Sequence, residues 1–124
     1  MTYTNRIPLF LALIGLFWAI PAQADTWASY TDAQIANAIY RAEGGVKTKH
    51  PYGILKRYRT TTARQACLNT IKNHRKRHAS HDCGLDFIEC LGGRYCPTIG
   101  ATNDPQGLNK NWIKNVKYFL TKGN

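Results

Sequence analysis

The alternation of apolar and polar positions along the chain predicts four helices. The first spans Asp32–Glu43, because its apolar residues recur every three or four positions, as they do on one face of a helix. Thr31 followed three residues later by Gln34 has the form of a capping box, and Gly44-Gly45 is typical of a helix end. We therefore expect this helix to deliver a glutamate at its C-terminus.

The same reasoning predicts three further helices. They run from Thr61 or Thr62 to about His78, from Asp86 to Gly92-Gly93, and over Lys110–Thr121 with Asn109 as the cap. The segments Val46–Arg59 and Arg94–Leu108 are rich in turn-forming residues and are expected to be loops. The pattern predicts a small, mostly helical domain with one long irregular loop after its first helix.

The N-terminal 24 residues are predicted to be a signal peptide rather than part of the fold. Arg6 precedes an uncharged, mainly apolar run over residues 7–24, and Ala22-Gln23-Ala24 has the small-x-small pattern of a cleavage site. Cleavage before Asp25 would leave one domain, residues 25–124, exported to the periplasm or the exterior. The alternative is an uncleaved anchor, although the run is slightly short of the ~20 residues of a membrane span.

Four cysteines follow this leader, and an even number in a small exported protein predicts two disulfides (Cys67, Cys83, Cys90 and Cys96). A metal site is the competing interpretation, since one cysteine lies close to three histidines (His74, His78, His81 and Cys83). An oxidising compartment favours disulfides, so we expect no metal and no cofactor. The histidines beside Arg75, Lys76 and Arg77 are interpreted as a solvated basic surface.

The net charge of +10 becomes +9 once Arg6 leaves with the signal peptide. We expect no nucleic acid ligand, because the polyanions available outside the cell are cell-wall polymers and anionic lipid heads. We expect a monomer that binds the wall and does not insert into the membrane. A cationic binder of anionic lipid is a further hypothesis, based on the run from Lys72 to His78.

Glu43 is the principal candidate for chemistry. A carboxylate in the last turn of a helix faces the negative end of the helix dipole, and this one also lies at the edge of the apolar stripe. Both effects favour its protonated form, which is the state that a general acid needs near neutral pH. The alternative is an ordinary solvated glutamate at a helix end.

The order of elements resembles the lysozyme-like lytic transglycosylase domain, of the soluble-lytic-transglycosylase or goose-type lysozyme kind. The segments that carry the resemblance are Ile39-Tyr40-Arg41-Ala42-Glu43, Tyr52-Gly53-Ile54, Leu91-Gly92-Gly93-Arg94-Tyr95 and Trp112-Ile113-Lys114-Asn115-Val116. The chain departs from the family at three places. Gly44 replaces a serine, Leu55 and Lys56 stand where a glutamine is usual, and Cys96 replaces an asparagine.

The resemblance implies an exported enzyme that cleaves the linkage between N-acetylmuramic acid and N-acetylglucosamine in peptidoglycan with one glutamate. Glu43 would be catalytic, and Tyr95 would hold this glutamate or the substrate N-acetyl group. Tyr52 and Gly53 would let a sugar ring approach the backbone, and Arg94 would be either a contact to a peptide or lactyl carboxylate or a structural ion-pair partner. The departures leave open a wall-binding or assembly-accessory protein that has the fold without catalysis.

The scarcity of acids favours the one-glutamate scheme over a pair of carboxylates. The chain has seven acidic residues, of which Asp32, Asp86 and Glu89 are interpreted as helix caps. For the disulfides we predict Cys67 with Cys96, since the segment after Tyr95 would pack near the site, and Cys83 with Cys90 as a local link across the third helix. Four cysteines allow three connectivities on sequence alone.

Overall fold

The computed structural model describes residues 25–55, 57–80, 83–96 and 109–123. Within these ranges the chain is mostly helical and has no strand, as predicted. Its elements are η1 (Thr26–Ser29), α1 (Asp32–Ala42), η2 (Gly45–Lys47), α2 (Ala63–Ser80), α3 (Phe87–Tyr95) and α4 (Lys110–Thr121). The predicted signal peptide and most of the predicted loop 94–108 lie outside the described residues. In the described part, none of the helices has the length and apolar character that crossing a bilayer requires.

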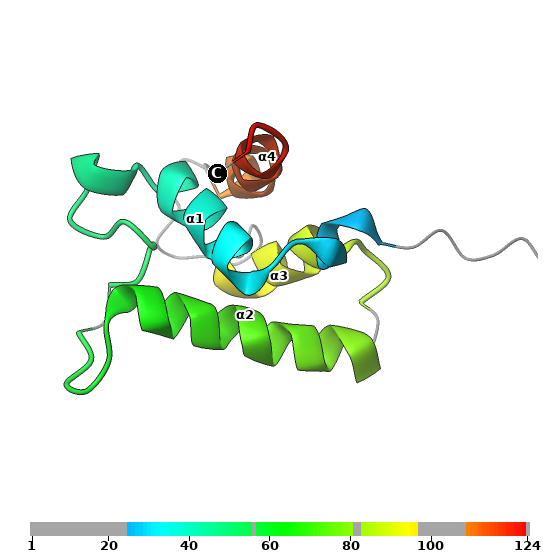
Figure 1. The fold of residues 1–124 in the computed structure, drawn as a ribbon, viewed down its shortest axis with the longest axis horizontal. Helices are drawn as coiled ribbons and strands as arrows, with labels where there is room; N and C mark the ends of the chain where they lie inside the picture. Colours follow the sequence, from blue (N-terminus) through cyan, green and yellow to red (C-terminus); the bar gives the residue numbers. More distant parts are fainter. Residues whose placement is uncertain (1–24, 56, 81–82, 97–108, 124) are drawn as a thin grey trace, which may run out of the picture.

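Helices α1 and α3 form the centre of the domain, and each packs against both α2 and α4. Figure 1 shows this arrangement, with α2 along one side of the pair and α4 on the other. The apolar faces meet in one core, whose fully buried larger side chains are Ile35, Ile39, Ile71, Phe87, Ile88, Leu91 and Val116. The described residues between α1 and α2, 45–55 and 57–62, lie at one end of this group of helices, beside the C-terminus of α1.

Two helix starts follow their sequence signatures. Thr31 and Gln34 form the predicted capping box of α1, and Asp86 and Glu89 form an equivalent box at α3. Asn109 occupies the N-cap of α4, but its side chain makes no capping hydrogen bond there.

The predicted end of α3 at Gly92-Gly93 is wrong, because the helix continues to Tyr95. Gly92 is buried inside the helix, and a Cβ at this position would lie 2.7 Å from the Ile113 side chain. The glycine therefore serves the close approach of α3 and α4 rather than a helix stop.

Cys83 and Cys90 form a disulfide, which confirms the predicted link across the start of α3. The other predicted disulfide is not formed, since Cys67 and Cys96 are not bonded to each other. The Cys67 thiol is buried on α2 and instead lies in hydrogen-bonding contact with the Tyr95 hydroxyl. Burial raises the pKa of this thiol to about 11, so it is protonated at neutral pH.

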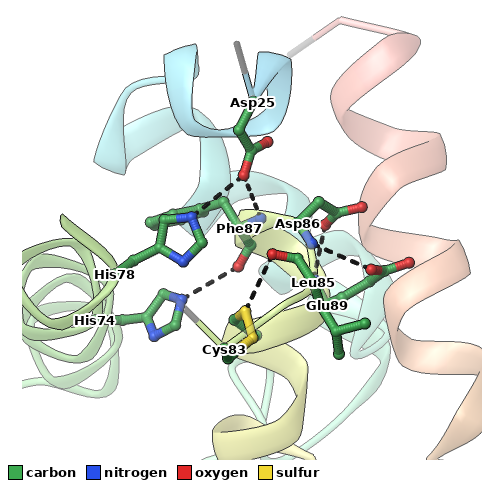
Figure 2. Close-up of a disulfide and its surroundings, with 9 residues drawn as sticks. Asp25, His74, His78, Cys83, Leu85, Asp86, Phe87 and Glu89 are labelled. Atoms are coloured by element: carbon green, nitrogen blue, oxygen red, sulfur yellow. Dashed lines mark hydrogen bonds and ion pairs between the residues drawn. A yellow bond between two sulfur atoms is a disulfide. The ribbon is translucent and has the colours of Figure 1, made fainter. Parts of the chain in front are cut away.

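The histidines of α2 are not on a solvated surface, contrary to the prediction. His74 is only 3% exposed, and its Nε2 lies 3.2 Å from the Phe87 carbonyl oxygen (Figure 2). His78 is partly buried, and its Nε2 lies 3.3 Å from the Asp25 carboxylate. No group of residues suited to hold a metal ion occurs in the described ranges, and His81 falls outside them.

Asp25, directly after the predicted cleavage site, joins the start of the domain to α3 (Figure 2). One carboxylate oxygen accepts a hydrogen bond from the Trp27 amide (3.1 Å), and the other accepts one from the Phe87 amide (2.6 Å). The second oxygen also faces His78. Asp25 therefore accepts hydrogen bonds from backbone N–H groups at the starts of both η1 and α3. Such N–H groups have no acceptor within their own helix.

Replacing Asp25 with alanine is expected to lower the free energy of unfolding by about 1–2 kcal/mol, the usual cost of losing a helix cap. Asp25→Asn keeps one oxygen acceptor and is expected to fall between the alanine variant and the parent. Urea denaturation followed by circular dichroism measures both. Equal stability of all three proteins would contradict the capping role.

Candidate active site

Glu43 is the C-cap of α1, directly after the last helical residue. Its side chain is half-buried and faces a cavity of about 310 Å³. The described residues that line this cavity are Glu43, Thr48, His50, Gly53, Leu55, Tyr95, Cys96 and Asn109. Glu43 thus lies at the end of the helix, as the sequence pattern predicts, and the structure places it beside a hollow rather than in open solvent.

Trp112 of α4 binds the Glu43 carboxyl group. Its indole N–H donates a hydrogen bond of 2.8 Å to Glu43 Oε1. The sequence pattern assigned Trp112 to the core stripe of α4, and it is indeed 95% buried, with 5% of its surface exposed. A buried indole N–H needs an acceptor, and here that acceptor is the candidate catalytic group.

The surroundings of Glu43 favour its protonated form. Burial raises the pKa of the carboxyl group above its usual range, while the hydrogen bond from Trp112 offsets part of that rise. The dominant cause is desolvation of the charged form. Since Trp112 engages Oε1, the proton of the neutral acid would be carried by Oε2, on the other side of the carboxyl group.

Gly53, in the loop after α1, lies against the same carboxyl group. Its backbone has φ +65°, and a Cβ at this position would lie 2.8 Å from Glu43 Oε1. Only glycine fits this contact without displacing the glutamate, both for space and for backbone conformation. Gly53, which the sequence resemblance assigned to the substrate site, lines the same cavity as Glu43.

Tyr95 lines the cavity, but its hydroxyl does not donate to Glu43. The hydroxyl donates instead to the backbone carbonyl of Tyr52, and the ring stacks on Trp112 at 5.3 Å between centroids. Burial raises the pKa of Tyr95, so its hydroxyl stays protonated. Tyr95 is thus a positioning residue, which holds the segment before Gly53 and the ring of Trp112.

Two predicted substrate contacts lie elsewhere. The Tyr52 side chain is buried against Tyr40, and its hydroxyl accepts a 3.1 Å hydrogen bond from Arg64. The Tyr52 side chain therefore packs away from Glu43, and its backbone carbonyl is the part that bonds to Tyr95 of the site. Arg94 is exposed in the last turn of α3 and does not line the cavity around Glu43.

Glu43 is the only carboxylate among the described residues that line this cavity. Asp82 and Asp104, the two loop acids that the sequence left available as partners, lie outside the described ranges. The described geometry therefore offers one acid with a raised pKa, a fixed hydrogen-bond donor on one oxygen, and space beside it for a ligand.

Comparison of the chain with protein-family models finds no match, and searches of curated proteins and of solved structures also find none. The fold and the site thus define a small helical domain, stabilised by a disulfide, with one half-buried glutamate at the end of a central helix.

Replacing Gly53 with alanine is expected to displace the Glu43 carboxyl group and to destabilise the domain by about 1–2 kcal/mol, through a residue at positive φ and a steric clash. Gly84→Ala is the matched control, because Gly84 has φ +78° but no atom of the described residues lies within 4 Å of the added Cβ. Thermal or urea unfolding should show the larger loss for Gly53→Ala. Equal losses would show that the steric contact between the added Cβ and the Glu43 carboxyl group does not lower the free energy of unfolding.

Proposed function

We propose that this protein is an exported enzyme that cleaves the bond between N-acetylmuramic acid and N-acetylglucosamine in peptidoglycan, in the manner of a lytic transglycosylase. The observation that carries the proposal is the Glu43 carboxyl group, half-buried beside a cavity, bonded to Trp112 and shifted toward its neutral form. Export remains a prediction from residues 1–24, and the choice of substrate rests on the sequence resemblance.

The chemistry requires one proton to move twice. Glu43 Oε2 donates its proton to the glycosidic oxygen, and the bond from that oxygen to C1 of the muramic acid breaks. The substrate's own N-acetyl group stabilises the resulting positive charge. The 6-hydroxyl of the same sugar then bonds to C1 and returns its proton to Glu43, which gives a 1,6-anhydro sugar and restores the acid.

This scheme suits a cavity whose described lining has a single carboxylate. Glycosidases that use water usually require a second carboxylate to activate it or to attack the sugar. In the intramolecular reaction, the nucleophile is the 6-hydroxyl of the substrate itself, and Glu43 alone accepts its proton. Trp112 supports both steps, because a hydrogen bond to Oε1 stabilises the carboxylate that forms between them.

A wall-binding protein without catalysis is the second candidate. It is favoured by the exposed cations near the cavity, such as Lys49 and Arg57, which would bind an anionic polymer whether or not Glu43 reacts. The two functions differ in the products released from purified sacculi. Anhydro-muropeptides support the transglycosylase, reducing ends indicate hydrolysis, and sedimentation with sacculi without release supports the binder.

Glu43→Gln is expected to abolish release of anhydro-muropeptides, with a rate loss of ~10⁴-fold or more, because one residue serves as both acid and base. Glu89→Gln is the matched control, since glutamine also completes a capping box and Glu89 lies at the start of α3. Chromatography of sacculus digests gives the rates. Substantial cleavage by Glu43→Gln would refute the proposed role.

Glu43→Gln is also expected to change how the stability of the protein depends on pH. A carboxyl group whose pKa is raised by folding stabilises the folded state below its unfolded pKa of 4.5, and this contribution is lost as pH rises through the folded pKa. Glu43→Gln should therefore gain stability relative to the parent as pH increases across that window.

Trp112→Phe is expected to raise the pKa of Glu43 further, because it removes the hydrogen bond that favours the charged form. The alkaline limb of kcat/KM against pH should move upward, since the first step needs the protonated acid, and the maximal rate should fall. Trp27→Phe is the control, because Trp27 packs at the other end of the domain, against Tyr30 and Lys117. An NMR titration of Glu43 provides the pKa independently of activity, and an unchanged value would contradict the role of Trp112.

A further inference from the structure

A second and larger hollow adjoins the Glu43 cavity. It has a volume of about 630 Å³ and shares His50 and Leu55 with the wall of the first. Its described lining consists of Lys49, His50, Ile54, Leu55, Arg57, Tyr58, Thr61 and Ala63. Thr61 also borders a third hollow, at the start of α2, so each of the three hollows shares a lining residue with the next.

The charge of this hollow is one-sided. The sequence contains no acidic residue between Glu43 and Asp82, whereas the segment before α2 is basic (Lys47, Lys49, Lys56, Arg57 and Arg59). Lys49 and Arg57 are exposed and line this hollow, and neither forms an ion pair with any residue that the structure describes. A concave surface lined by charge of one sign attracts ligands of the opposite sign.

The lining of this hollow also offers apolar and hydrogen-bonding groups, which a site for free phosphate would not need. Leu55 is 68% exposed and Tyr58 is 43% exposed, in a domain whose other large apolar side chains are mostly buried. The Thr61 hydroxyl is buried and has no hydrogen-bond partner in the described structure. Cations beside exposed aliphatic and aromatic side chains, with a hydroxyl at the base, suit a short peptide that carries carboxylates.

We propose that this hollow binds an acidic peptide, namely the peptide stem attached to the muramic acid residue whose glycosidic bond lies at Glu43. This identification of the ligand rests on the proposed function. Lys49 and Arg57 pair with carboxylates of the stem, while Leu55 and Tyr58 cover its aliphatic parts. The shared wall at His50 and Leu55 lets one substrate molecule occupy both hollows, the sugar at Glu43 and the peptide beyond it.

The test measures binding separately from catalysis. The full mature chain with Glu43→Gln is titrated calorimetrically with the free tetrapeptide L-Ala-γ-D-Glu-meso-diaminopimelate-D-Ala, and with the same peptide after amidation of its carboxylates. We expect the acidic peptide to bind and the amidated peptide to bind at least about tenfold more weakly, as for the loss of two partly exposed ion pairs.

The matched variants remove equal charge at two places. Lys49→Gln with Arg57→Gln should weaken binding of the acidic peptide about tenfold. Lys72→Gln with Lys76→Gln removes two exposed cations of α2, outside all three hollows, and should change binding less than twofold. Circular dichroism and unfolding curves confirm that both variants fold, which is expected because all four side chains are exposed.

Three results would overturn the proposal. The first is equal binding of the acidic and amidated peptides, and the second is an equal loss in the two double variants, which would indicate general attraction to a basic protein. The third is absence of peptide binding together with Lys49- and Arg57-dependent binding to vesicles containing phosphatidylglycerol, which would identify a lipid surface instead.

The outcome is separable from that of the proposed function. If sacculi are not cleaved by the parent protein, the peptide titration can still succeed, and the protein is then a peptide-stem binder. If sacculi are cleaved but the peptide does not bind, the enzyme stands and this inference fails. If both hold, Lys49→Gln with Arg57→Gln should raise KM for peptide-bearing glycan strands more than it raises KM for peptide-free strands.

Discussion

The hydrogen bond from Trp112 to Glu43 connects the last helix of the domain to the end of the first. The two residues are 69 positions apart in the sequence, so this contact exists only when α4 has packed against α1. A half-buried carboxyl group without such a donor would lose solvation of its charged form and gain nothing in return. Packing of α4 against α1 therefore also brings the hydrogen-bond donor to the candidate acid.

The loop after α1 depends on a second set of contacts around the same centre. Tyr95 holds the Tyr52 carbonyl, and Arg64 at the start of α2 donates both to the Tyr52 hydroxyl and to Asn37 of α1. These bonds fix the backbone immediately before Gly53, whose lack of a side chain brings the loop against Glu43. Three segments that are distant in the sequence thus determine where one carboxyl group lies, and Tyr95 contributes by packing rather than by touching the acid.

The sequence predicted those parts of the fold that depend on nearby residues. The capping boxes at Thr31 and Asp86, the helix that ends in Glu43 and the Cys83–Cys90 link each involve partners within a few positions of one another. The role of Trp112 could not be read in this way, because an apolar stripe shows that a tryptophan is buried and does not show what its N–H will meet. Gly92 was misread for a related reason, since a glycine that admits a neighbouring helix has the same local pattern as one that ends its own.

The distribution of acids helps to explain why the pKa of Glu43 is raised in so basic a chain. Asp25 faces His78, Asp32 binds Arg75, and Asp86 with Glu89 binds Lys117, so every other described acid has a basic partner. Glu43 has an uncharged donor instead, and no cation forms an ion pair with it in the described residues. A lysine or arginine in direct contact would lower its pKa and remove the proton that a general acid must supply. The cations of the following segment line the adjacent hollow, where they can attract an anionic ligand without holding the acid in its charged form.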